Sequence, residues 1–299
     1  MRDKIFFSFS VEGKIRMKKQ RLWPNWKINA QKWNNHLKRT IFDIWLFEEL
    51  ESEKQKEANF IVMETVKQIP YGMSNFEDVI MQNRYYVDKT MYIPLLEDQA
   101  NYLIFIRPRR FGKSLLLSML RSYYDLSQKD KFQQLFGNLW IGQHTTPLQG
   151  KYQILYLDFS KIGGSIDELP QRFDSYSAVQ LDGFLNRYRE YYTDEFIERF
   201  SAADKGIDKL HILDDEARRL GYPLYLIIDE YDNFTNVVLN EKGNEIYRAI
   251  THASGFYRDA FKNYKGMFDR IFMIGVSPVT LDDLSSGYNI GWNISTSPV

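Results

Sequence analysis

The sequence predicts an α/β fold with a doubly wound, mainly parallel sheet and helices on both faces. Four short apolar runs carry this prediction, at residues 102–106, 152–158, 224–228 and 271–275. Continuous runs of this kind are typical of strands that are buried on both faces of a sheet. Stretches with helical periodicity separate them, and strands that alternate with helices pair in parallel. We therefore expect a ligand at the carboxyl ends of these strands.

Composition excludes several classes of protein. The 299 residues carry 39 basic and 39 acidic side chains, and 44% of them are hydrophobic, which is a globular composition. The chain has no Cys, and its four His are scattered, so we expect neither disulfides nor a structural zinc site. No apolar run approaches the ~20 residues of a membrane span. We expect a soluble, cytoplasmic protein with no membrane partner.

The turn after the first run, RPRRFGKS, has the pattern of a phosphate-binding loop. An apolar strand precedes it, and an apolar helix predicted over about 113–125 follows it. This order is the Walker A arrangement of P-loop NTPases, in which the Lys113 ammonium reaches the β- and γ-phosphates and the Ser114 hydroxyl ligates Mg²⁺. Arg107 stands where that motif usually has its first glycine. The predicted phosphate-binding residues are Arg109, Arg110, Phe111, Gly112, Lys113, Ser114 and Leu115.

The run at 224–228 ends in the acidic pair Asp229-Glu230. In P-loop ATPases an Asp at this Walker B position holds Mg²⁺, and the adjacent Glu polarises the attacking water. We therefore predict ATP and Mg²⁺ as cofactors, Lys113 and Glu230 as catalytic residues, and Ser114 and Asp229 as metal ligands. The alternative is an acidic pair that caps the next helix. It is less favoured, because the pair directly follows five apolar strand residues downstream of a GKS loop.

The run IFMIGVS at 271–277 predicts a third strand that ends in small polar residues. Beside a phosphate loop, such a strand often ends in a polar residue that contacts the γ-phosphate or positions water, and Ser277 is the candidate here. A simple turn at Ser277-Pro278 explains the same pattern equally well.

Residues 1–62 differ from the rest of the chain. They hold four of the six Trp, and residues 1–40 carry eleven Lys or Arg against Asp3 and Glu12. Strand-like alternation occurs at 5–11 and helical periodicity at about 29–57. A basic arm for nucleic acid is one interpretation. A poorly specified extension is the other, and the one we favour. We therefore predict an N-terminal extension at 1–62 and a P-loop domain at 63–299.

Four blocks of this sequence resemble the bacterial AAA-ATPase-like domain family. They lie at 69–97, 104–120, 226–234 and 273–290, in the family's order, and the resemblance covers about 64–295. The RPRRFGKS loop is typical of that family, which accounts for Arg107. The resemblance implies a P-loop domain that binds ATP and that is often fused to a C-terminal PD-(D/E)xK nuclease domain. We expect the lid and nuclease regions to be missing after Val299, and we assign no nuclease activity.

Three functional hypotheses follow. The leading one is Mg²⁺-dependent ATP hydrolysis coupled to an unknown process. The second is a nucleotide-gated binding or scaffold module without significant turnover, and the third is nucleic-acid association through the basic arm.

A further expectation concerns the edge of the sheet. P-loop ATPases commonly place one more strand beside the phosphate-loop strand, but residues 278–299 are rich in Ser, Gly, Asn, Pro and Asp. We therefore expect the strand at 102–106 to lie at a sheet edge or to be covered by residues 1–62. An uncovered edge would favour a homo-oligomer.

Overall fold

A computed structural model describes residues 6–9, 15–18, 51, 67–233, 256–277 and 291–296. The chain divides into two compact units, Met1–Lys67 and Gln68–Val299. In the first unit, β1 (Phe6–Phe9) and β2 (Ile15–Lys18) form an antiparallel pair. Apart from residue 51, the helix predicted at 29–57 lies outside the described residues.

The second unit contains one sheet in which every pair of neighbouring strands is parallel. Its order is β4-β5-β6-β3-β7, and the strands are β3 (Tyr102–Ile106), β4 (Gln153–Asp158), β5 (Leu224–Asp229), β6 (Arg270–Gly275) and β7 (Trp292–Asn293). All four predicted runs lie in it, so the predicted α/β fold with a parallel sheet is confirmed.

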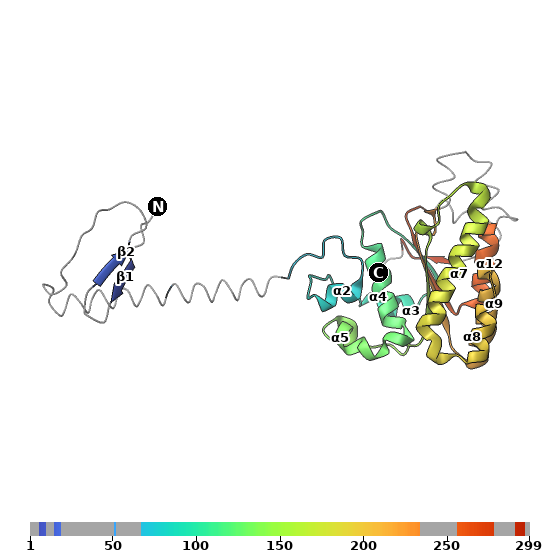
Figure 1. The fold of residues 1–299 in the computed structure, drawn as a ribbon, viewed down its shortest axis with the longest axis horizontal. Helices are drawn as coiled ribbons and strands as arrows, with labels where there is room; N and C mark the ends of the chain where they lie inside the picture. Colours follow the sequence, from blue (N-terminus) through green and yellow to red (C-terminus); the bar gives the residue numbers. More distant parts are fainter. Residues whose placement is uncertain are drawn as a thin grey trace. The chain divides into compact units, whose positions relative to one another are not determined.

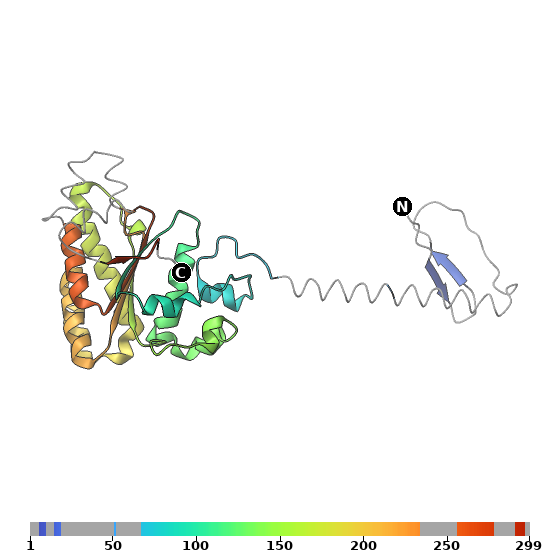
Figure 2. The same cartoon turned by 180° about the vertical axis from the view of Figure 1, so that it is seen from behind.

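Helices cover both faces of this sheet (Figure 1). On one face lie α7 (Leu169–Tyr188), α8 (Asp194–Ser201), α9 (Gly206–Leu220) and α12 (Phe256–Met267). On the other lie α2 (Phe76–Met81), α3 (Tyr92–Glu97), α4 (Lys113–Tyr124), α5 (Phe132–Phe136) and α6 (Trp140–Gln143). The view from behind shows the same two layers (Figure 2).

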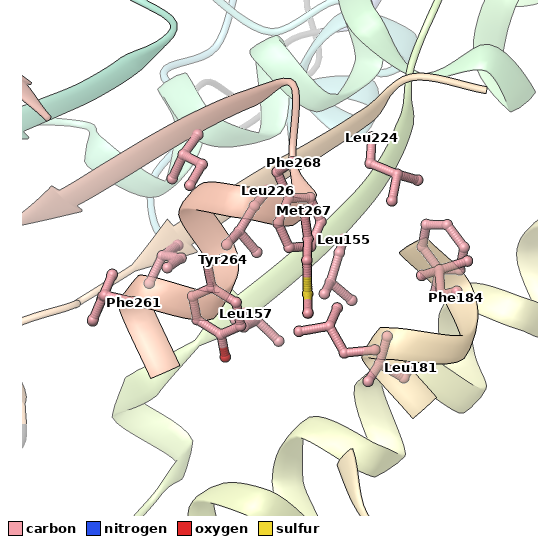
Figure 3. Packing of buried hydrophobic residues seen from close by; sticks show 14 of the residues in the cluster. Leu155, Leu157, Leu181, Phe184, Leu224, Leu226, Phe261, Tyr264, Met267 and Phe268 are labelled. Carbon is pink, nitrogen blue, oxygen red and sulfur yellow. The ribbon is translucent and has the colours of Figure 1, made fainter. Parts of the chain in front are cut away.

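Alternation along the strands sorts their side chains into two cores. Leu155 and Leu157 of β4 and Leu226 of β5 join the cluster beneath α7, α9 and α12 (Figure 3). Ile154 and Ile227, which point the other way, join the cluster beneath α4. Burial on both faces is the physical reason that these strands are apolar between their ends.

Two of these strands, β4 and β5, end in an acidic residue. Asp158 ends β4 and Asp229 ends β5, and the two are partners in the β4–β5 register. Their side chains lie on the α4 face, at the carboxyl edge of the sheet.

The expectation about the sheet edge is wrong. Residues Trp292–Asn293 pair with Leu103 and Ile104 of β3, so β3 lies inside the sheet and not at its edge. The Ile294 amide donates to the Ile104 carbonyl (3.0 Å) and the Ile106 amide to the Ser295 hydroxyl (2.8 Å). Because β7 has only two residues and pairs through its backbone, the sequence contains no apolar run that would predict it. The argument for self-association through an open β3 edge is removed with it.

The caps of α2 and α3 differ from what the local sequence predicts. The box Ser74-Asn75-Phe76-Glu77 predicts Ser74 as the cap of α2, but Asn75 is the cap, and its side chain accepts from the amides of Glu77 and Asp78. Asp88 and Thr90 are residue types that cap helices and stand just before α3, yet no side chain caps that helix. Asp88 and Thr90 instead accept from the amides of Trp140 and Ile141, at the start of α6. The cap of α2 is thus shifted by one residue, whereas long-range contacts with α6 engage Asp88 and Thr90.

The outer edge of β4 is protected by α7. The hydroxyl of Tyr188 accepts the Ile154 amide (2.8 Å), and that of Tyr176 accepts the Asp158 amide (2.7 Å). Edge strands with free amides tend to pair with other chains, so these two tyrosines satisfy donors that would otherwise be exposed. No helix among the described residues is long and apolar enough to cross a membrane.

Candidate functional site

The loop from Arg107 to Gly112 joins β3 to α4 at the carboxyl edge of the sheet. Gly112 has φ 72° and ψ 24°, and Arg110 has φ 69°, so two residues of the loop are left-handed. A Cβ on Gly112 would meet no atom within 4 Å, so the backbone conformation, not lack of space, favours glycine there.

The start of α4 offers unpaired backbone donors. The first helical hydrogen bond runs from the Leu116 amide to the Gly112 carbonyl (3.0 Å), and no side chain caps this helix. The amides of Lys113, Ser114 and Leu115 therefore precede the first bonded turn. Together with the positive end of the helix dipole, they form a favourable place for an anion.

Lys113 folds back over this loop. Its side chain is buried, at 8% exposure, and its Nζ donates to the Pro108 carbonyl (3.3 Å). The ammonium is thus held above the loop, where it also favours the ionised forms of Asp229 and Glu230.

Ser114 and Asp229 meet across the gap between α4 and β5. The Ser114 hydroxyl donates to Asp229 Oδ2 at 2.9 Å, well inside the roughly 8 Å limit for two groups that share a hydrated Mg²⁺. Tyr156 Oη donates to the same oxygen at 3.4 Å, and the Glu230 amide donates to Oδ1 at 3.0 Å. Asp229 is therefore a buried carboxylate with three donors.

Burial raises the pKa of Asp229, and the nearby charge of Asp158 raises it further. The hydrogen bond from Ser114, the Glu230 amide and the Lys113 charge oppose this increase. The pKa of Tyr156 is also raised, first by burial and then by Asp229 and Asp158, so its hydroxyl keeps the proton that it donates.

Glu230 follows in a strained backbone conformation, with φ 50°. Side chains with a Cβ rarely adopt this region, and such strain gathers at functional sites. Burial raises the pKa of Glu230, with further increases from Asp229 and Asp158, whereas Lys113 and Arg109 oppose them. A carboxylate with a raised pKa is a better proton acceptor than an ordinary glutamate.

Ser277 is held at the end of β6 by its backbone. The Asp232 carboxylate accepts from the amides of Val276 (3.1 Å) and Ser277 (2.6 Å), and the Tyr231 hydroxyl donates to the Ser277 carbonyl (2.8 Å). A Cβ on Gly275 would approach Asp232 and Tyr231 to 2.6 Å, which explains the glycine. The turn after β5 and the end of β6 are thus one unit, and the role of the Ser277 side chain stays a prediction.

Arg107 has a structural role at the base of the loop. Its guanidinium lies 4.3 Å from the centre of the Phe105 ring and donates to the carbonyls of Ile106 and Ser295 (both 2.9 Å). The segment after β7 thereby supports the loop at the position where the usual motif has glycine. Arg109, Arg110 and Phe111 are exposed beyond it.

A cavity of about 470 Å³ adjoins the loop on the β3–β7 side. Gly112 and Lys113 form one wall, and α3 and the strands form the others; the lining is mostly apolar, with Tyr92, Leu95, Leu96, Phe105, Phe111, Leu116, Phe272 and Ile294. Asp229 and Glu230 do not line it. The site therefore has a polar end toward β5 and an apolar end toward β7, with the loop between them.

The donors at the polar end fit a hard cation. Ser114 and Asp229 offer only oxygen, and no group of three or more His, Cys, Asp or Glu that could hold a metal occurs in the described part of the chain. Mg²⁺ commonly binds through one or two protein oxygens and completes its shell with phosphate oxygens and water. The residues present fit that ion when a nucleotide is bound with it.

A family model described as a predicted AAA-ATPase matches residues 70–285, more than two thirds of the chain. This chain belongs to the AAA-ATPase-like family. The resemblance seen in the four blocks is thereby confirmed, and membership supports an ATP-binding role. No curated protein matches the chain.

Two features of this AAA-ATPase-like domain were not predicted from its sequence. Asp232, whose carboxylate holds the end of β6, stands three residues after Asp229 in DEYD, and the predicted site includes only the first two acidic residues of that sequence. Asp158 and Tyr156 of β4 also face Asp229. The signal for Asp158 was present, because it ends an apolar run just as Asp229 does, and parallel strands end at one edge.

Proposed function

We propose that this domain binds ATP with Mg²⁺ at the carboxyl edge of the sheet and hydrolyses it. The observation that carries the proposal is the contact between Ser114 and Asp229, 2.9 Å apart at the N-terminus of α4. It brings the two predicted metal ligands from separate motifs to one place, directly beside the loop and Lys113.

The site's two ends match the two ends of a nucleotide. The unpaired amides and Lys113 suit the phosphates, and the apolar cavity suits a base and ribose. Its volume of about 470 Å³ lies within the usual 300–1,000 Å³ of small-molecule sites. An inorganic anion would not fill this apolar cavity, so a nucleoside phosphate fits the whole site better.

Each residue then has a role. Lys113 and the amides hold the phosphates, and Ser114 and Asp229 hold the ion. When bound, Mg²⁺ would neutralise charge on the phosphate oxygens. Glu230 lies next to Asp229 with a raised pKa, so it is placed to accept a proton from water. The arrangement supports phosphoryl transfer to water better than binding alone.

Binding and turnover can be measured separately. We expect the full chain to bind a fluorescent ATP analogue and to release phosphate from ATP in the presence of Mg²⁺. Lys113→Ala should lose binding, whereas Glu230→Gln should retain binding and lose phosphate release, typically by a factor of 10² or more. Asp259→Asn, an exposed change on α12, serves as the control.

The results discriminate between the hypotheses. Failure of the wild-type chain to bind ATP refutes the proposal. Binding without phosphate release leaves the nucleotide-gated scaffold as the better account, and phosphate release that Glu230→Gln does not change contradicts the role of Glu230.

A further inference from the structure

Tyr156 is the one aromatic hydroxyl bonded to Asp229 among the described residues. It lies on β4 opposite Ile227 in the β4–β5 register, two residues before Asp158, and so on the same sheet face as Asp229. Its Oη donates to Asp229 Oδ2 at 3.4 Å, the oxygen that also accepts the Ser114 hydroxyl. No motif in the sequence assigns a function to this tyrosine.

The Tyr156 ring is held by the same helix that carries Ser114. The guanidinium of Arg121 lies over the ring, 4.2 Å from its centre. Ser114 and Arg121 are seven residues apart on α4, a spacing that places them on one face two turns apart. Tyr156 therefore links Arg121 of α4 to the same Asp229 oxygen that Ser114 reaches directly, and the cation–π contact stabilises its ring position.

We propose that Tyr156 is a positioning residue that orients the Asp229 carboxylate for Mg²⁺. This inference rests on the proposed function. If the oxygen of Ser114 ligates the ion, Tyr156 and the Glu230 amide remain as donors that hold Asp229 without ligating the metal themselves. Tyr156 bonds one carboxylate oxygen and the Glu230 amide bonds the other, so together they fix the orientation of the carboxylate and of its free lone pairs.

Partners of this kind typically change metal affinity by 10- to 100-fold when they are removed. The Tyr156 bond is long, so we expect a change at the lower end, about 10-fold. The effect should appear only in the Mg²⁺-dependent part of nucleotide binding, because Tyr156 bonds neither the loop nor Lys113 among the contacts described.

The test uses the full chain and a fluorescent, non-hydrolysable ATP analogue. Binding is measured in EDTA and then as a function of Mg²⁺ concentration, for the wild type, Tyr156→Phe and Tyr176→Phe, with thermal unfolding of each. Tyr176→Phe is the matched control, since it removes a hydroxyl bonded to the Asp158 amide at the same end of β4 but not to Asp229. Arg121→Met is a second variant that leaves the hydroxyl in place and removes the cation over the ring.

We expect Tyr156→Phe to raise the Mg²⁺ midpoint about 10-fold with unchanged affinity in EDTA, Arg121→Met to raise it less, and Tyr176→Phe to leave it unchanged. An unchanged midpoint in Tyr156→Phe overturns the inference, as does an equal rise in Tyr176→Phe, which would mark a general effect at the end of β4. Absence of any Mg²⁺ effect on the wild type is a different outcome, because it refutes the proposed metal site itself.

Discussion

Gly112 offers a direct test of the phosphate-loop conformation, because the chain contains a matched control. Gly112 precedes α4 with φ 72° and ψ 24°, and Gly221 follows α9 with φ 72° and ψ 27°. At both positions an added Cβ would meet no atom within 4 Å. Gly112→Ala and Gly221→Ala therefore impose the same backbone strain without a steric clash, one at the candidate site and the other away from it.

As long as both residues stay left-handed, the expected loss of stability is the same for both variants. A residue with a Cβ in the left-handed conformation destabilises the folded state by about 1–2 kcal/mol. Alanine also lowers the conformational entropy of the unfolded chain, which stabilises the protein by about 0.5 kcal/mol. The net loss is about 1 kcal/mol, or about 2–4 °C in Tm for a domain of this size. Thermal unfolding followed by circular dichroism measures it.

The effect on binding should differ between them. The loop in Gly112→Ala can relieve its strain by leaving the left-handed region, which redirects the amides at the start of α4. The relieved strain no longer lowers the stability of the free protein, and ATP must instead restore the loop at a cost of up to about 1 kcal/mol. The affinity for ATP then falls by up to about 5-fold. Gly221→Ala should bind ATP like the wild type. A Gly112→Ala variant with both the stability and the ATP affinity of the wild type, or equal affinity losses in both variants, would refute this reasoning.

Three further predictions concern groups that the structure buries. Asp232→Asn should lower the free energy of unfolding by about 2–3 kcal/mol, because the carboxylate accepts two amides at the end of β6; chemical denaturation measures it. Tyr188→Phe should cost about 2–3 kcal/mol in the same assay, since its hydroxyl accepts a β4 amide and donates to Asp125 (2.9 Å); exposed Tyr85→Phe should cost nothing measurable. Burial raises the pKa of Glu97, so the folded state binds the proton of this carboxyl group more tightly than the unfolded state does. The stability that this group contributes is therefore lost as the pH rises through the raised pKa. Above a pH of about 4.5, the Tm of the wild type should fall more steeply with pH than the Tm of Glu97→Gln.

Much of the fold could be predicted from local sequence patterns. The four apolar runs mark buried strands because each of these strands packs against apolar side chains on both faces of the sheet. The GKS turn and the Asp229-Glu230 pair were found for a related reason: polar residues at the ends of buried strands are unusual, and parallel strands bring their ends to one edge. Their convergence at Ser114 and Asp229 follows from the parallel topology.

Other features were decided only by tertiary structure. Trp292–Asn293 pairs with β3 through backbone groups, which every residue carries, so its two-residue sequence holds no periodic signal. Asp232 and Tyr156 act through partners 44 and 73 residues away in the chain. The sequence by itself determined which residues are apolar, which turn has the pattern of a phosphate-binding loop and which strands end in an acidic residue. Register and long-range packing decided which donors reach each carboxylate, because these distances depend on how separate elements pack and not on the spacing of residues along the chain.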